Sequence, residues 1–474
     1  MWADYGSINS VFANGRNEYS VEITFMQSII MHLDMNSYFA SVEQQDCPAW
    51  RGKPVGVCEH LGGIIIGASV EAKKWGITTG APVWEARKLY PKIILTHTRP
   101  EAYRFYTRKF LKVVGDYTGL VEKYSIDECF LDLTKVCNVK ISGKLPQADP
   151  WEEAVNIARQ IKHRFKTEVG DWLRCSIGIA DNKTVAKIAS DMRKPDGLVV
   201  VLPDAGQGRI GPIEERPISI AADRRQAAAL RYGGECLVLS KERLYRQLAL
   251  IDVPGIGRRQ ERNLGELGIK TLSDLRDYPR SRLVARFGPV MGYHLHSLGR
   301  LQSAWKAPVA DDEEIKSMGH MYTLPQEYRQ REFFMPVLYK LCEMVARRLR
   351  RKDLTGNVLH FFAHDKQWQG FGRSLKLGYF LQDGREAFLE IAGTLRSEFR
   401  IPDSVRIIGV TIAGLRPRVN QLSLFGDAER ERRLAEALDK INDKYGEFSI
   451  SRAQIIKAGK VFRDSVGFGR IKEL

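Results

Sequence analysis

The chain has 474 residues, which is long enough for roughly three or four domains of typical size. Lys and Arg outnumber Asp and Glu by 73 to 57, and the net charge of +16 favours a polyanionic partner, nucleic acid ahead of a membrane surface. No apolar run is long enough to cross a bilayer, and the seven cysteines include no Cys-x-x-Cys pair, which argues against a membrane protein, a zinc site and a disulfide scaffold. We therefore expect no signal peptide, no membrane contact and a reducing cytoplasm.

After a polar N-terminal extension at residues 1–27, the first clear element is a buried strand at 29–33 that ends at Asp34. Residues 37–43 then have helical character. A carboxylate at the end of a buried strand, just before a helix, is a common position for a metal ligand. A helix-capping aspartate is the equally simple alternative, and both interpretations remain open at this point.

Two short strands within residues 53–69 lead into a helix at 70–76. Lys73 and Lys74 follow a Gly-Ala-Ser turn, where backbone N–H groups and ammonium groups can bind phosphate oxygens. Solvated lysines on a surface helix are the simpler interpretation. A long basic helix is expected over 100–114.

Two adjacent carboxylates, Asp127 and Glu128, interrupt an otherwise apolar segment at residues 123–132. Burying carboxylates is costly unless a charge compensates them, and a bound cation does so well. The alternative is an exposed turn between two strands, in which both side chains are solvated. Asp34 lies in an equally apolar context upstream and therefore favours a shared cation site.

The region up to residue 203 alternates helices and strands, which predicts one α/β domain. Residues 204–240 are rich in Gly, Pro, Arg and Ala, and we interpret them as an insertion or linker. The expected elements of the α/β region after the carboxylates are a helix at 151–165, a strand at 173–180, a helix at 183–192 and a strand at 198–202.

A Pro-Gly-Ile-Gly sequence at residues 254–257 predicts a helix-hairpin-helix, in which Gly255 and Gly257 let the backbone approach a phosphate. Such a contact ignores base identity, and an ordinary helix turn is the alternative. A further helix is expected at 281–301, and an acidic linker follows at 306–315.

Residues 316–416 predict a separate unit with the element order βαββαβ. Lys316, Arg373 and Lys376 place positive charge on its open sheet face or its edge, although a solvated charged face is the ordinary explanation. The expected elements are strands at 315–324, 357–363, 371–380 and 405–415, and helices at 332–351 and 385–399.

The polar tail contains three large apolar residues, Leu422, Leu424 and Phe425. They are costly to leave exposed, which indicates a peptide that binds in a partner's pocket. A charged amphipathic helix is expected at 428–445, followed by a basic remainder with little organisation.

Three segments together resemble one family: residues 33–43 (LDMNSYFASVE), 124–132 (YSIDECFLD) and 176–197 (SIGIADNKTVAKIASDMRKPDG). Over about residues 28–426 the chain resembles the Y-family, lesion-bypass DNA polymerases, of the bacterial DNA polymerase IV type. The resemblance implies an α+β multidomain right-hand polymerase with palm, fingers, helix-hairpin-helix thumb and βαββαβ little finger. The expected division is palm and fingers 28–203 (fingers about 43–100), insertion or linker 204–240, thumb 241–305, linker 306–315, little finger 316–416 and C-terminal tail 417–474.

The resemblance also implies template-directed DNA synthesis of low fidelity opposite damaged template. The reaction would be phosphoryl transfer with two Mg²⁺ ions per active site. By this analogy Asp34 and Asp127 bridge both ions, and Glu128 holds the ion at the primer end. The backbone carbonyl of Met35 completes the ion on the triphosphate side.

Substrate contacts are implied in the same way. Phe39 aligns with the family's sugar gate, which excludes a 2′-hydroxyl by contact, and Tyr38 would pack beside it. Lys194 matches the lysine that meets the triphosphate. Lys73 stands where the family usually has arginine, and Val70 where it commonly has tyrosine, so the expected triphosphate contacts depart from the family pattern.

Gln421, Leu422, Leu424 and Phe425 resemble the bacterial sliding-clamp peptide Gln-Leu-x-Leu-Phe, which implies recruitment by the clamp in a bacterial cytoplasm. The expected partners are primer–template DNA, deoxynucleoside triphosphates and the clamp, with the chain acting as a monomer. One alternative is a catalytically inactive DNA-binding scaffold of the same fold, which has no need of three intact carboxylates. Another is a nucleotide cyclase, which would need neither a thumb nor a clamp peptide.

Overall fold

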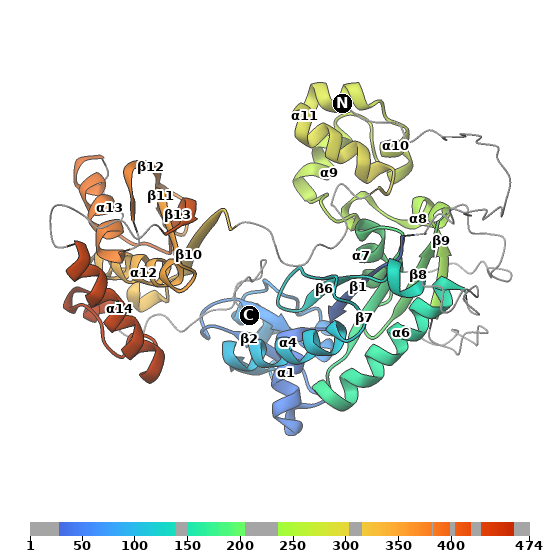
Figure 1. The fold of residues 1–474 in the computed structure, drawn as a ribbon, viewed down its shortest axis with the longest axis horizontal. Helices are drawn as coiled ribbons and strands as arrows, with labels where there is room; N and C mark the ends of the chain where they lie inside the picture. Colours follow the sequence, from blue (N-terminus) through green and yellow to red (C-terminus); the bar gives the residue numbers. More distant parts are fainter. Residues whose placement is uncertain are drawn as a thin grey trace, which may run out of the picture.

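The computed structural model describes residues 28–138, 149–203, 236–302, 315–381, 383–398, 403–418 and 428–458. The expected N-terminal extension, residues 204–235 and the candidate clamp-binding peptide at 421–425 lie outside the described residues. Figure 1 shows an α/β body that reaches residue 240, a helical body at 241–302 and a sheet-and-helix body from 315 onward. No helix in the described ranges is both long and apolar enough to span a bilayer.

A six-stranded sheet with the order β5-β6-β1-β7-β8-β9 forms the centre of the α/β body. Its middle strand β1 (Ile30–Met35) pairs antiparallel with β6 (Glu128–Asp132) on one side and with β7 (Cys175–Ala180) on the other. Strand β1 is buried on both faces, as its continuous apolar run predicts. The remaining strands are β5 (Val121–Lys123), β8 (Leu198–Leu202) and β9 (Cys236–Ser240).

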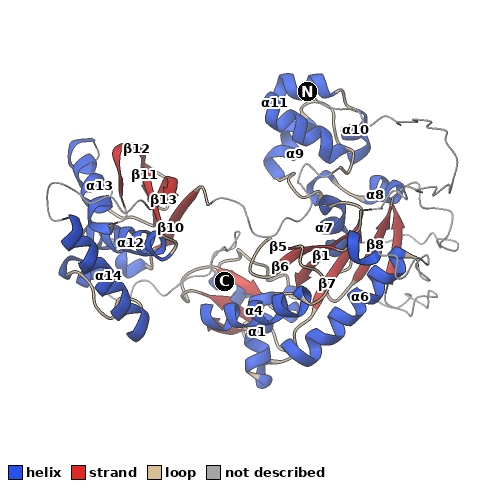
Figure 2. Ribbon diagram, viewed as in Figure 1, coloured by secondary structure: helices blue, strands red, loops and turns tan. Residues whose placement is uncertain are grey.

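Helices cover both faces of this sheet (Figure 2). Helices α4 (Pro100–Gly115) and α6 (Pro150–Arg164) contribute Phe110 and Ile161 to the core that also contains Met31 and Leu33. Helix α7 (Lys183–Met192) packs on the opposite face, in a second core with Ile30 and Phe130. Helix α7 lies so close to β7 that a Cβ on Gly178 would be 2.1 Å from the Ala186 carbonyl oxygen, and only glycine fits there.

A smaller three-stranded sheet with the order β3-β2-β4 forms the expected fingers. Strand β2 (Val55–Cys58) pairs antiparallel with β3 (Ile65–Ala68) and parallel with β4 (Ile94–His97). Its buried residues form a separate core. The associated helices are α1 (Tyr38–Asp46), which follows β1, and α2 (Val70–Lys73) and α3 (Val83–Leu89).

The expected boundary after the α/β body needs one correction. Residues 236–240 fall within the predicted insertion at 204–240, but they form β9, which pairs parallel with β8 at the edge of the large sheet. The strand was missed because its pairing partner lies more than thirty residues upstream, beyond a segment rich in Gly, Pro and Arg.

The helical body contains the predicted helix-hairpin-helix. Its helices bury leucines around a core shared with α7, and the long helix is interrupted at Gly288, where φ is 79°. The helices are α8 (Lys241–Gln247), α9 (Arg258–Gly265), α10 (Leu272–Asp277) and α11 (Arg280–Gly299).

The third body has the predicted element order βαββαβ, and its antiparallel sheet has the order β10-β13-β11-β12. Both helices pack on one face, where alternate strand residues such as Leu359, Phe361 and Val410 form the core. The elements are β10 (Ser317–Thr323), α12 (Arg331–Arg351), β11 (Leu354–His364), β12 (Gly370–Leu381), α13 (Gly384–Glu398) and β13 (Ile407–Pro417).

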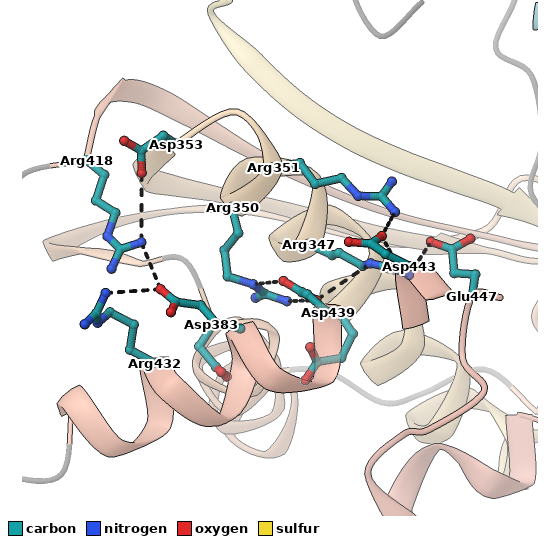
Figure 3. A network of polar contacts seen from close by, with 12 residues as sticks. Arg347, Arg350, Arg351, Asp353, Asp383, Arg418, Arg432, Asp439, Asp443 and Glu447 are labelled. Carbon is teal, nitrogen blue, oxygen red and sulfur yellow. Dashed lines mark hydrogen bonds and ion pairs between the residues drawn. The ribbon is translucent and has the colours of Figure 1, made fainter. Parts of the chain in front are cut away.

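The tail beyond the sheet is more organised than the sequence predicted. The expected amphipathic helix is present as α14 (Ala428–Tyr445), and a 3₁₀ turn at Ala453–Ala458 packs against α12 and buries Ile455 in the same core. Figure 3 shows that the arginines at the end of α12 point toward acidic residues of the tail. Arg350, for example, donates to Asp439 through Nε at 2.7 Å and through Nη2 at 2.9 Å.

Candidate active site

The sheet register brings the predicted carboxylates together. Asp34 of β1 lies directly opposite Glu128 of β6, and Asp127 immediately precedes β6. The Met35 N–H donates to the Asp127 carbonyl oxygen at 2.8 Å, which ties the end of β1 to the turn before β6. Directly opposed residues of antiparallel strands have Cβ atoms about 5 Å apart, so Asp34 and Glu128 lie on one face at one end of the sheet.

Burial raises the pKa of both Asp34 and Asp127. Asp34 is partly compensated by Lys194, whose Nζ lies 2.8 Å from Oδ2. Asp127 accepts a hydrogen bond of 2.5 Å from the Ser125 hydroxyl. The raised pKa values mean that nearby positive charge would stabilise the ionised forms.

Glu128 has a different environment. Burial opposes its ionisation, but the hydrogen bond with His32 and the positive charge of Lys187 outweigh burial and hold the pKa of Glu128 at about 2. His32 Nε2 lies 3.1 Å from Glu128 Oε2, and Lys187 forms an ion pair with the same oxygen. Glu128 is therefore an anion at neutral pH.

A cleft of about 540 Å³ opens beside these carboxylates. The fingers contribute Gly67 and Val70 to its lining, and Val70 has no hydroxyl to offer a phosphate. Glu128 does not line the cleft and stands beside it on β6. Seven of the predicted site residues do line it, namely Asp34, Met35, Tyr38, Phe39, Lys73, Asp127 and Lys194.

The donor set fits a hard divalent cation. Carboxylate and carbonyl oxygens are the ligands that Mg²⁺ prefers, and Mg²⁺ commonly takes only one or two carboxylates together with phosphates and waters. Within the described ranges, no three acidic, His or Cys side chains already converge on one point. The carboxylates of Asp34, Asp127 and Glu128 could supply oxygen ligands to such a cation.

The Phe39 ring has little freedom to move. It packs against the Tyr103 ring with centroids 4.7 Å apart, and a Cβ on Gly67 would lie 2.9 Å from the Phe39 Cβ. Tyr38 packs beside Phe39, as expected, but its hydroxyl donates to the Tyr103 carbonyl oxygen at 2.7 Å and faces α4. Tyr38 therefore helps to hold the Phe39 ring in position.

The candidate DNA contacts lie on the two other bodies. Gly255 has a φ of 101°, which favours glycine, and Gly257 is the N-cap of α9, whose first residues are exposed. Lys316, Arg373 and Lys376 are all exposed. They do not share one face, because Lys376 pairs with Val358 on the open face of the sheet. Arg373 pairs with Phe361, which belongs to the helix-covered face, so Arg373 lies on that side of the edge strand β12, where it is exposed.

The sequence patterns did not identify His32 and Ser190 as site residues. These two side chains contact each other, and His32 also contacts Glu128. His32 precedes Asp34 by two residues and therefore shares its face of β1. Ser190 lies on α7 at helical spacing from Lys187. A polar residue at alternate spacing within an apolar strand was the available signal.

The palm-like sheet with carboxylates at one end, the separate fingers sheet, the helix-hairpin-helix body and the βαββαβ body together define a right-hand nucleic-acid polymerase. Residues 33–191 match the impB/mucB/samB family, residues 315–424 match the C-terminal domain of that family, and residues 251–300 match the thumb domain of DNA polymerase-iota. A solved Y-family DNA polymerase chimera has the same fold, with a TM-score of 0.62 and 22% identity over 82% of this chain and 100% of that chain.

Curated relatives match along almost the whole chain. DNA polymerase IV of Pelotomaculum thermopropionicum is 33% identical over 447 residues, which cover 93% of this chain and 99% of that protein. DNA polymerase IV of Moorella thermoacetica is 33% identical over 429 residues, which cover 90% of this chain and 95% of that protein. The chain belongs to the Y-family of DNA-directed DNA polymerases and is of the DNA polymerase IV type.

Proposed function

We propose that this chain is a low-fidelity polymerase that inserts deoxynucleotides opposite damaged or distorted template. The observation that carries the proposal is the grouping of Asp34, Asp127 and Glu128 at one end of the sheet, beside a cleft lined by Phe39 and Lys194. An inactive DNA-binding scaffold would not need this arrangement.

Two Mg²⁺ ions, when bound, would lower the pKa of the primer 3′-hydroxyl and neutralise charge on the leaving pyrophosphate. Asp34 and Asp127 would hold both ions, with the Met35 carbonyl on the triphosphate side. Glu128 would hold the ion at the primer end. The protein's other contributions would be to orient the nucleotide and to hold Glu128 as an anion beside His32 and Lys187.

The lysines at the cleft would bind the triphosphate. Lys194 lies 2.8 Å from Asp34 and 2.7 Å from Asp191, and these carboxylates outweigh the effect of burial and raise its pKa, so it stays charged. Lys73 is exposed at the end of α2 and lines the cleft from the fingers side. An ammonium binds phosphate as a point charge, whereas the arginine usual in the family would bind it through a planar fork.

The helical body and the βαββαβ body would hold primer–template DNA without reading its sequence. The N–H groups at the start of α9, after Gly255 and Gly257, can bind a backbone phosphate. Lys316, Arg373 and Lys376 can bind further phosphates, which makes affinity strongly dependent on salt. We also propose the domain division expected from the sequence, with 236–240 moved to the palm.

We propose recruitment by a bacterial sliding clamp through residues 421–425, with the chain acting as a cytoplasmic monomer. Deletion of these five residues should leave unaided, distributive synthesis within about twofold of wild type and should abolish stimulation by the clamp. Primer extension with and without loaded clamp measures both effects. Loss of unaided synthesis would instead assign the segment a structural role.

The function is tested by single-nucleotide insertion opposite an undamaged base and opposite a lesion panel, on a primed template with Mg²⁺. The expected result is insertion at both kinds of site, which stops when the ions are chelated and resumes when Mg²⁺ is restored. DNA binding without insertion at any template position would support the scaffold alternative and overturn the proposal.

Phe39→Ala should raise the incorporation of ribonucleotides relative to deoxynucleotides by at least about tenfold, because a steric clash of about 1.4 kcal/mol is worth a factor of ten. The comparison of kcat/KM for one nucleotide pair, such as GTP and dGTP, measures the change. Phe105→Ala, at an exposed phenylalanine outside the cleft, is the matched control. If Phe39→Ala discriminates as well as wild type, the gate lies elsewhere.

A further inference from the structure

His32 is a fully buried ionisable side chain for which the mechanism above gives no role. Its exposed fraction is 0%, and it lies on β1 two residues before Asp34, opposite Phe130 of β6. Nδ1 lies 2.7 Å from the Ser190 hydroxyl oxygen, and Nε2 lies 3.1 Å from Glu128 Oε2. The imidazole thus bridges α7 and the carboxylate.

Donor and acceptor chemistry fixes the orientation of this bridge. An ionised carboxylate can only accept, so Nε2 must carry the hydrogen that points to Glu128. Nδ1 of the neutral ring then accepts from the Ser190 hydroxyl, which is 1% exposed. The Lys187 carbonyl oxygen, 2.8 Å from Ser190 Oγ, competes for that hydroxyl. With a neutral ring, donation to Lys187 would leave Nδ1 buried without a donor, which native interiors avoid.

The contacts to Glu128 are asymmetric. His32 and Lys187 both bind Oε2, and no hydrogen bond to Oε1 occurs among the described residues. Lys187 has a flexible stem, whereas the His32 ring is held on β1 against the Phe130 ring, with centroids 4.5 Å apart. The rigid partner therefore determines how the carboxylate is turned, and Oε1 stays available to a cation.

We propose that His32 and Ser190 are positioning residues for Glu128. Ser190 holds the His32 ring, the ring holds Oε2 through Nε2, and Oε1 is thereby directed toward the cation at the primer end. This inference rests on the metal role proposed for Glu128. Ser190 acts through His32 by selecting the tautomer that carries hydrogen on Nε2.

His32→Phe keeps an aromatic ring beside Phe130 but removes the donor to Glu128. Loss of such a supporting hydrogen bond commonly costs about 10- to 100-fold in metal affinity or activity. We therefore expect kcat to fall by about that factor and the Mg²⁺ concentration for half-maximal rate to rise. KM for the nucleotide should stay within about twofold, because Phe39 and Lys194 are untouched. His32→Gln retains an amide donor and should recover most of the loss, and Ser190→Ala should show a smaller loss of the same kind.

Binding of Mn²⁺ provides a readout that does not depend on turnover. Free Mn²⁺ is measured by electron paramagnetic resonance in a complex of the full chain, primer–template and an α,β-imido nucleotide. His32→Phe and Ser190→Ala should weaken one of the two classes of bound Mn²⁺, the one that Glu128 holds, by about tenfold and about threefold respectively, and should leave the other class unchanged. Circular dichroism and thermal melting establish that each variant is folded. If His32→Phe does not fold, Ser190→Ala and His32→Gln decide.

Glu128→Ala separates failure of the inference from failure of the proposed function. If Glu128→Ala synthesises DNA like wild type, the metal role itself is wrong. If Glu128→Ala is inactive while folded His32→Phe and Ser190→Ala keep wild-type kcat and Mn²⁺ affinity, only the positioning role is overturned. In the Glu128→Ala background, His32→Phe should add no further loss of Mn²⁺ affinity, and an additive loss would contradict an action through Glu128.

Discussion

Asp127→Ala should lower the rate of nucleotide insertion by about a thousandfold or more. Asp127 lies opposite the end of β1, and its partly buried carboxylate lines the cleft beside Asp34. A catalytic cation contributes several kcal/mol of charge stabilisation in the transition state, and about 1.4 kcal/mol is worth a factor of ten in rate. Removing a ligand proposed to hold both ions should forfeit most of that stabilisation.

Single-turnover insertion under saturating nucleotide measures the loss, and fluorescence anisotropy measures DNA affinity in the same preparation. Affinity should stay within about threefold of wild type, because the candidate DNA contacts lie on the other two bodies. Asp171→Ala is the matched control, since this carboxylate is 66% exposed, pairs with the side chains of Arg51 and Gln45, and does not line the cleft. It should insert nucleotides at the wild-type rate. An Asp127→Ala enzyme as fast as this control would remove the metal assignment.

Asp439→Ala should loosen the packing of α14 on α12 by about 3 kcal/mol. The Asp439 side chain is 16% exposed and holds both Nε and Nη2 of Arg350, whose side chain is 9% exposed. Asp439→Ala removes the bidentate partner of a guanidinium that is almost fully buried, and breaking a buried ion pair commonly costs about 3–5 kcal/mol. We take the lower end because the carboxylate is not fully buried.

Asp443→Ala is the matched comparison within the same helix (Figure 3). Asp443 contacts Arg347 and Arg351, but it is 52% exposed, and Arg347 keeps Glu447 as a partner at 3.2 Å. Exposed ion pairs are worth about 1 kcal/mol or less. Native-state hydrogen exchange should therefore show α14 amides exchanging about a hundredfold faster in Asp439→Ala and only a fewfold faster in Asp443→Ala. Equal exchange rates in the two variants would mean that burial of the carboxylate does not determine how much each ion pair stabilises the docking of α14.

Local patterns were sufficient to predict most elements. The apolar run before Asp34 predicts a buried strand, and the helix at 183–192 was expected with the bounds that the structure shows. The βαββαβ order followed from alternating strand and helix patterns. Each of these elements was predicted from the residue pattern within it, so no knowledge of distant partners was needed.

Features that depend on distant partners could not be predicted. The pairing of His32 with Ser190 joins residues 158 positions apart, and Glu128 meets Lys187 across 59. The docking of α14 rests on ion pairs between residues about ninety apart, such as Arg350 and Asp439. A charge run at the end of α12 carries no information about whether DNA, solvent or another helix neutralises it.

We propose that Asp34, Asp127 and Glu128 together hold two cations. Anomalous diffraction from crystals of the full chain with primer–template, a non-hydrolysable nucleotide and Mn²⁺ tests it most directly. We expect two anomalous peaks, both in contact with Asp34 and Asp127, and one of them also in contact with Glu128 Oε1. A single peak away from Glu128, or peaks bound by other side chains, would contradict it.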